Sequence, residues 1–346
     1  MTIYLEMRSW ISPTALCVIL LAGCGPRLPE SVGPAQEILV LIDPASRQSL
    51  EPHLKAVFEK TLYTPQEEKI FRLQFEDVAN FDRYENKRRK NILVVAELDA
   101  PHPTAGFLRN ILSPNVQDAV RMNRSGVFWK EDVWAKEQLL MAVSGADSAA
   151  LVDNLQMEAD RLYERIEDAR NERIQRLIYR YGERKDVTER LGREFGWQVR
   201  VAFGYRILEA YPDSGFVVLT KEEPNRWLFV YWEDGISPDE LSEEWCIRKR
   251  NDITRRFFER DRIVQDHLEI SQTEFAGNLA FVLQGLWENK KKWAGGPFRS
   301  YAFVDVATDR FYYIDCGVYS PNKRKEPYLR QIDLMARSFR QVESAP

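Results

Sequence analysis

The sequence predicts an α+β protein of two subdomains, each a largely antiparallel sheet packed by helices, with one long helix between them. Three observations support this prediction. Unbroken apolar runs at residues 37–43 and 91–98 have the length and composition of buried strands. Residues 148–181 contain neither Pro nor Gly and are typical of a long helix. After Gly182 a second series of strands follows, separated by gaps too short for helical crossovers.

The first subdomain is predicted to span residues 37–182. Its apolar residues alternate between strand-like runs and helical spacing, and the run at 91–98 indicates a central strand covered on both faces. The expected elements are strands at 37–43, 70–78 and 91–98, a helix at 46–62, and two segments at 126–134 and 138–144 that pair or flank a short turn.

The long helix carries one apolar stripe, and charges of both signs fill its other faces. The stripe consists of Leu151, Leu155, Leu162, Ile166, Leu177 and Tyr181. Such a stripe indicates packing either on the protein's own sheet or in a coiled coil. The heptad register breaks after Ala169, which favours packing on the sheet.

The second subdomain is predicted to span residues 183–346. Hairpin-length gaps between its apolar runs indicate antiparallel pairing. The expected elements are helices at 187–195, 239–260 and 325–340, and strands at 198–203, 216–221, 226–232, 274–286, 298–305 and 310–319.

Composition excludes several classes of protein. The 346 residues are 44% hydrophobic and 12% aromatic, which excludes a disordered chain. A net charge of -4 provides no basic footprint for nucleic acid, so no nucleic-acid partner is expected. The short basic run at 87–90 indicates either a basic patch or, preferably, a solvated turn.

The N-terminus predicts a secretion signal. Residues 10–21 form an uncharged, mostly apolar run too short to span a bilayer as a helix, and Leu21, Ala22, Gly23 and Cys24 follow. This pattern resembles the lipobox of bacterial lipoproteins. The resemblance implies cleavage between Gly23 and Cys24 and acylation of Cys24, so residues 1–23 would be removed. The alternative is a buried N-terminal helix whose Cys is incidental.

Three further details bear on this signal. Glu6 is unusual in such a signal, and a start at Met7 in place of Met1 would remove it. Residue 25 is Gly and not the Asp that retains lipoproteins in the inner membrane, which favours the outer membrane of the cell envelope. Residues 24–36 are predicted to be a tether, and membrane attachment would rest on acyl chains at Cys24.

Besides the acylated Cys24, the mature chain would contain two cysteines, Cys246 and Cys316. In an oxidising compartment two such residues can form a disulfide. The alternative is two buried thiols that behave as small apolar side chains.

The stretch from residue 285 to 305 is the most distinctive in the chain. Its aromatic side chains predict either a ligand cleft or the core and rim of a sheet, and its Gly-Gly-Pro step predicts a tight turn that could also hold an anion. The candidate cleft residues are Trp287, Trp293, Gly295, Gly296, Phe298 and Tyr301.

With the lipobox, the Pro-Glu-Ser-Val-Gly tether at 29–33 and the ending at 319–325, this stretch resembles a domain-of-unknown-function family of bacterial envelope lipoproteins. Gly285-Leu286-Trp287 and Gly295-Gly296-Pro297-Phe298 carry the resemblance over nearly the whole mature chain. Gln284 and Ala294 depart from the family's usual Arg and Met, which indicates a divergent member. The resemblance implies a location and an architecture but no activity.

The residues provide no catalytic signature. The three His residues lie far apart, and no zinc-hydrolase helix, nucleophile elbow, phosphate loop or dinucleotide fingerprint occurs, so no metal or cofactor is expected. Glu288 and Asp305 are the candidate acid–base pair. We therefore expect a non-catalytic envelope lipoprotein that binds a protein or glycan partner. The alternatives are a hydrolase of envelope glycan or peptidoglycan, and a carrier of an acyl chain or other ligand.

Overall fold

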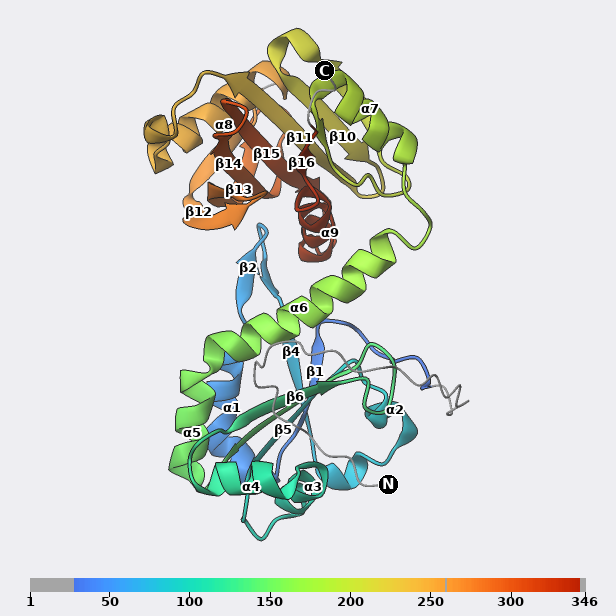
Figure 1. Cartoon of the computed structure of the whole chain (residues 1–346), viewed down its shortest axis with the longest axis vertical. Coiled ribbons are helices and arrows are strands. Elements are labelled where there is room, and N and C mark those ends of the chain that lie inside the picture. The colour runs from blue at the N-terminus through green and yellow to red at the C-terminus, as the bar shows by residue number, and fades with distance from the viewer. Residues whose placement is uncertain (1–27, 259, 343–346) are drawn as a thin grey trace, which may run out of the picture. The chain divides into compact units, whose positions relative to one another are not determined.

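The computed structural model describes residues 28–258 and 260–342. Within it the chain divides into two compact units. The first contains residues up to 60 and 69–173, and the second contains residues 61–68 and those from 174 onward. The signal and Cys24 lie outside the described residues. In Figure 1 the helices and strands are coloured in chain order, from blue near the N-terminus to red near the C-terminus.

The first unit is a five-stranded sheet in the order β4-β1-β5-β7-β6. Strands β4, β1, β5 and β7 pair in parallel, and only β6 runs antiparallel to its neighbour. The strands are β1 (Glu37–Leu41), β4 (Arg72–Glu76), β5 (Asn91–Glu97), β6 (Val127–Glu131) and β7 (Leu139–Gly145). The expectation of a largely antiparallel sheet is therefore corrected for this unit, because helical segments connect its parallel strands, and of these only the helix near residues 46–62 was expected.

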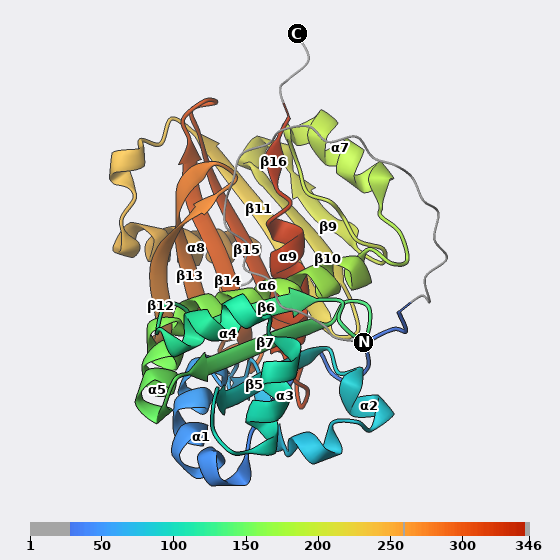
Figure 2. The same cartoon turned by 60° about the horizontal axis from the view of Figure 1, so that its bottom comes forward.

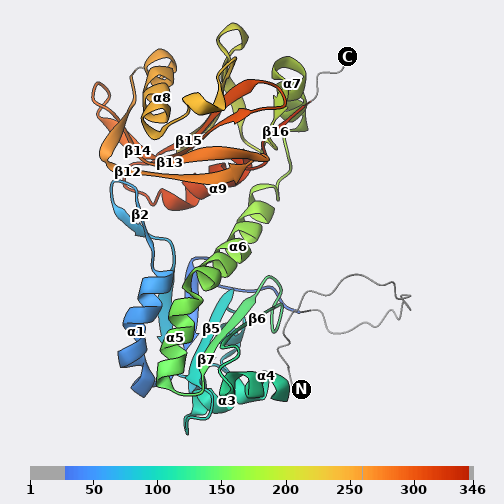
Figure 3. The same ribbon diagram turned by 60° about the vertical axis from the view of Figure 1, so that its left-hand side comes forward.

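Helices cover both faces of this sheet. One face packs against α1 (Pro44–Phe58), α5 (Ser148–Met157) and α6 (Ala159–Ile178), and the other packs against α3 (Pro103–Ile111) and α4 (Pro114–Arg121). Figure 3 shows α1 and α5 on the side of β5 opposite to α3. The central strand β5 is buried along nearly its whole length, as its apolar run predicts. The short helix α2 (Tyr84–Lys87) and a 3-10 turn at Val78–Asn80 precede it.

The predicted long helix is two consecutive helices, α5 and α6, which meet at Glu158. Leu151, Leu155, Leu162 and Ile166 are buried against the sheet of the first unit. The last two residues of the predicted stripe, Leu177 and Tyr181, are exposed. The stripe therefore stops where the helix extends past its own sheet.

The basic run at 87–90 binds the segment that precedes β1. Arg88 donates from Nε to the carbonyl oxygen of Glu30 at 3.0 Å, and Lys90 donates from Nζ to the carbonyl oxygen of Gly33 at 2.6 Å. Lys136 pairs with the Glu30 carboxylate at 3.1 Å. Residues 30–33, predicted as part of a tether, are thus held on the first unit.

The second unit is built on a seven-stranded antiparallel sheet in the order β12-β13-β14-β15-β11-β10-β9. The antiparallel prediction is confirmed here. The strands are β9 (Arg206–Tyr211), β10 (Phe216–Lys221), β11 (Asn225–Asp234), β12 (Arg262–Phe275), β13 (Asn278–Asn289), β14 (Ala294–Asp305) and β15 (Arg310–Tyr319). Short 3-10 turns lie at Pro212–Ser214 and Pro238–Glu240.

Helices pack on both faces of this sheet. Helix α8 (Glu243–Phe257) packs on an apolar cluster that includes Phe229 and Tyr313, and α9 (Glu326–Ala336) packs on the other face against β15, β11 and β14. Figure 2 shows α9 in front of the strands, and Figure 3 shows α8 and α9 on opposite sides of them. Helix α7 (Lys185–Phe195) leads into β8 (Trp197–Gln198), which pairs with β16 (Arg340–Gln341).

A hairpin from early in the chain completes the second unit. It consists of β2 (Thr61–Tyr63) and β3 (Glu67–Lys69), although its sequence position places it among the elements of the first subdomain. The Glu68 carboxylate accepts hydrogen bonds from the backbone N–H groups of Lys325 at 2.7 Å and Glu326 at 3.2 Å. These groups begin α9, whose own N-cap residue provides no side-chain acceptor. Glu68 therefore caps a helix that lies more than 250 residues away in sequence.

Candidate functional site

The predicted aromatic cleft is not assembled. Trp287 and Phe298 are buried in the apolar cluster under α8. Tyr301 lies three residues after Phe298 in β14 and so faces the opposite side, where it stacks on Phe275 with ring centroids 4.1 Å apart. Trp293 lies at the β13–β14 turn and is 94% exposed. The alternative prediction, core and rim of a sheet, describes this group.

The two glycines of the motif lie within β14 and not in the turn itself. The residue with positive φ is Trp293, at +52°. A Cβ on Gly296 would lie 2.0 Å from the carbonyl oxygen of Val318 and 3.2 Å from the Trp287 indole nitrogen. Position 296 therefore requires glycine because the neighbouring strand and the Trp287 indole leave no room for a Cβ atom. Neither turn geometry nor anion binding explains this glycine.

The candidate acid–base pair is also separated. Glu288 lies opposite Gly295 at the start of β14, whereas Asp305 is the last residue of that strand. Gly295 and Asp305 are ten steps apart along the strand, which corresponds to roughly 33 Å. Glu288 accepts a hydrogen bond from Arg262, and Asp305 accepts one from the backbone N–H of Thr308. Neither the distance nor the partners support joint acid–base chemistry.

The two cysteines are buried free thiols. Cys246 belongs to α8 and packs in the cluster beneath it. Asp315 contacts Arg250 of α8, so its neighbour Cys316 points to the opposite face of the sheet. Because the sheet lies between the two sulfur atoms, they cannot form the disulfide that the sequence allowed. The alternative prediction, two buried thiols, describes these residues. Burial raises the pKa of Cys246 to about 12, so its thiol stays protonated.

A basic hollow lies on the second unit where the end of α8, the start of β12 and the β13–β14 turn meet. Its volume is about 750 Å³. Its lining contains five cationic side chains and one carboxylate. The lining residues are Asn251, Arg255, Arg260, Asp261, Arg262, Asn289, Lys290 and Lys291. We call this site the basic hollow.

Buried polar groups form the inner part of the basic hollow. Asn289 donates from Nδ2 to Asp261 Oδ1 at 2.6 Å and accepts from the backbone N–H of Lys292 at 2.9 Å. Burial raises the pKa of Asp261, while the hydrogen bond from Asn289 and the nearby charge of Arg250 act in the opposite direction. Asn251 accepts from the backbone N–H of Ile263 at 3.0 Å. These contacts join the end of α8, the start of β12 and the β13–β14 turn, and the cationic side chains lie at the rim.

The rim carries an excess of positive charge. Arg255 pairs with Asp252 at 2.9 Å, and Arg262 pairs with Glu288 at 2.8 Å. Arg260, Lys290 and Lys291 have no acidic partner among residues 28–258 and 260–342. Cations without partners around an open hollow attract an anion and offer N–H donors to its oxygen atoms.

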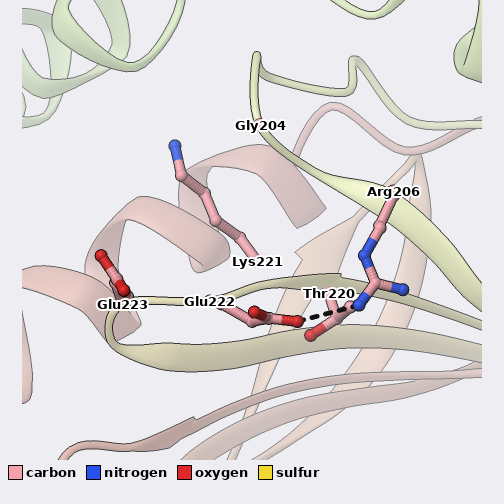
Figure 4. A pocket seen from close by; sticks show the side chains of 6 residues that line it. All are labelled: Gly204, Arg206, Thr220, Lys221, Glu222 and Glu223. Atoms are coloured by element: carbon pink, nitrogen blue, oxygen red, sulfur yellow. Dashed lines mark hydrogen bonds and ion pairs between the residues drawn. The ribbon is translucent and has the colours of Figure 1, made fainter.

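A second, smaller hollow on this unit is electrically balanced. It has a volume of about 320 Å³ at the β10–β11 turn and is lined by two cations and two carboxylates. Figure 4 shows Arg206 directed at Glu222, with which it pairs at 2.9 Å. Lys221 donates to the carbonyl oxygen of Phe203 at 3.0 Å. Thr220, which lines the same hollow with Gly204 and Glu223, donates to the backbone. These internal pairs make it a weaker candidate than the basic hollow.

Sequence reasoning missed the basic hollow because its residues come from two distant segments. The available signals were the alternation of Arg and Asp at 260–262 and the Lys run at 290–292. Within the part of the chain that the structure describes, no group of three His, Cys, Asp or Glu residues is arranged to hold a metal ion. No described helix combines the length and apolar character needed to cross a membrane.

Comparisons with known proteins identify domains without an assigned activity. A profile for a domain of unknown function, DUF8532, matches residues 31–179, and another, DUF4837, matches residues 184–338. A search of curated proteins found no match. The expected similarity to domains of unknown function is confirmed, although two profiles match where one family was expected. The lipoprotein character stays a prediction.

The chain also shows weak similarity to solved structures. LpqN of Mycobacterium tuberculosis, involved in cell envelope biogenesis, is 8% identical over 41% of this chain and 81% of its own, with a TM-score of 0.30. The Ran-binding protein Mog1p of Saccharomyces cerevisiae is 13% identical over 42% and 90%, with a TM-score of 0.30. A Bacteroides thetaiotaomicron protein is 6% identical over 43% and 46%, with a TM-score of 0.27. Scores of this size have no bearing on function.

Proposed function

We propose that this chain is a lipid-anchored protein of the bacterial cell envelope that acts by binding an anionic ligand at the basic hollow. The observation that carries the binding proposal is the set of three rim cations without an acidic partner among the described residues, next to the buried Asp261–Asn289 pair. The separation of Glu288 from Asp305 gives a hydrolase no support, and the burial of Trp287 and Phe298 gives an aromatic carrier cleft none.

The anchor is proposed from the lipobox residues Leu21 to Cys24, with Gly at position 25 favouring the outer membrane. Residues 30–33 are bound to the first unit, as described above. The chain from Cys24 to Pro29 spans at most roughly 17 Å. An acylated Cys24 would thus hold the first unit close to the bilayer surface.

The anchor predicts that a fatty-acid analogue is incorporated into wild-type protein and not into Cys24→Ala. Acylation requires the Cys24 thiol, and two or three chains are needed for stable attachment. Metabolic labelling followed by gel fluorescence measures this directly. Cys17→Ala, which changes a cysteine inside the same signal, is the control and should be labelled like wild type. Equal labelling of Cys24→Ala and wild type would refute the anchor.

The basic hollow predicts retention on phosphocellulose at neutral pH. The net charge of -4 opposes retention, so binding to this phosphate-bearing matrix reports a local cluster of cations. The full chain carrying Cys24→Ala, which avoids acylation, should lose retention when Arg255→Gln and Arg260→Gln are added. The control is Arg190→Gln with Arg193→Gln, which removes two exposed cations of α7 and should elute much later. Equal elution of the two pairs would contradict a site at the hollow.

A further inference from the structure

We propose that the β13–β14 turn, Lys290 to Trp293, docks the second unit on an anionic phospholipid surface, with Trp293 entering the headgroup region. The inference rests on the proposed function, because it assigns the anionic ligand of the basic hollow to the phosphate groups of a bilayer. It adds an apolar contact that anion binding by itself does not require.

The position of Trp293 suits a membrane contact, because the side chain does not belong to the core. Its side chain is 94% exposed at the tip of a hairpin, whereas Trp227 and Trp287, which also belong to the second unit, are buried. No ring or cation stacks on its indole among the residues that the structure describes. An exposed indole leaves a large apolar area in water, and its amphipathic ring partitions to the bilayer interface.

Cationic residues directly precede this indole in the turn. Lys290, Lys291 and Lys292 directly precede Trp293 in the turn, and Arg255 and Arg260 line the basic hollow together with Lys290 and Lys291. Each basic residue near an anionic membrane surface strengthens binding about fivefold. A lysine run beside an exposed tryptophan thus combines electrostatic attraction with interfacial insertion.

A bilayer fits these observations better than a small soluble anion does. A soluble phosphate would contact the cations and leave the Trp293 indole without a role, whereas a lipid surface uses both. The proposed acyl anchor also keeps the chain at the membrane, so a weak second contact is populated at a high effective concentration.

Vesicle binding of the full chain carrying Cys24→Ala tests the inference. Co-sedimentation is measured with vesicles of phosphatidylcholine alone and of phosphatidylcholine mixed with phosphatidylglycerol. We expect tighter binding to the mixed vesicles, a loss of about 25-fold in Lys290→Gln with Lys291→Gln, and a loss of about tenfold in Trp293→Ala. The matched control, Tyr181→Ala with Lys185→Gln, removes an exposed aromatic ring and a cation elsewhere on the unit and should bind like its parent. All variants keep residues 1–24, so differences between them report the turn.

Four outcomes would overturn the inference. Unchanged binding of Trp293→Ala would exclude insertion, and unchanged binding of the lysine variant would exclude charge recognition. Release from vesicles by inorganic phosphate, but not by sodium chloride of equal ionic strength, would assign the site to a free anion. If vesicles do not bind while phosphocellulose retention persists, the membrane contact fails and the anion site stands. Acylation of Cys24 is tested separately by labelling.

Discussion

Replacing Asp315 by Asn is expected to lower the free energy of unfolding by about 3–5 kcal/mol. Asp315 and Arg250 are buried, at 0% and 1% exposure, and Arg250 Nε donates to Asp315 Oδ2 at 2.6 Å. Ser300 donates to the same oxygen at 2.6 Å. The Arg250 guanidinium also lies 3.8 Å from the centre of the Phe298 ring. Asn would leave the Arg250 charge buried without its hydrogen-bonded counter-charge, and burying an unpaired charge costs free energy.

A double-mutant cycle with Arg250→Met tests this explanation. Each single variant leaves one buried charge unpaired, whereas the double variant leaves none, so it should lose less stability than the two single variants together. Urea unfolding followed by tryptophan fluorescence measures the three variants. The exposed pair Arg255–Asp252 provides the control, and Asp252→Asn should be nearly neutral. Additive losses in the cycle would contradict a coupled buried pair.

Asp333→Asn is expected to cost about 3 kcal/mol and to remove part of the acid sensitivity of the second unit. The Asp333 carboxylate is buried in α9 and accepts hydrogen bonds from Arg299 and Arg337 at 3.0 Å each, and from the Tyr301 hydroxyl. Burial by itself would raise the pKa of Asp333, but Arg299 and Arg337 outweigh it, and the pKa lies below its ordinary value.

The sign of the pH dependence follows from this lowered pKa. Asp333 binds a proton more readily in the unfolded chain, so its contribution to stability is complete above its ordinary pKa of about 3.9 and is lost as pH falls through its folded-state pKa. The gap in urea midpoint between wild type and Asp333→Asn should therefore be widest near neutral pH and should narrow below about pH 4. A gap that is constant down to pH 2 would show that the carboxylate's charge is not what stabilises α9.

Several elements were predictable because their residues interact locally. The apolar run at 91–98 is the buried strand β5, and the Pro- and Gly-free stretch at 148–181 contains α5 and α6. Helices α3 and α4 were missed because each is short and begins with a proline that also suits a loop. Their absence from the prediction made the connection that leads from β5 towards β7 look like a loop, so the parallel pairing of these two strands was not predicted. The predicted helix at 46–62 does connect two parallel strands, β1 and β4, but their pairing depends on tertiary contacts.

The candidate sites failed for a different reason. Trp287, Phe298 and Tyr301 are close in sequence, but strand alternation places Tyr301 on the other face of the sheet. Glu288 and Asp305 are close in sequence as well, yet Glu288 of β13 lies opposite the start of β14, whereas Asp305 ends β14. The basic hollow joins residues about 30 positions apart in sequence. The net charge of -4 for the whole chain gives no sign of the local excess of positive charge there.

The composition class, the lipobox prediction, the apolar runs and the antiparallel pairing in the second unit could be read from the amino-acid order, because each depends on residues that are neighbours in the chain. Folding in three dimensions fixes which strands pair in the first sheet, which face each side chain takes and which cations meet at the basic hollow. Glu68 illustrates the physical reason. Its carboxylate caps α9 because folding brings together groups more than 250 residues apart, and no local pattern specifies such a contact.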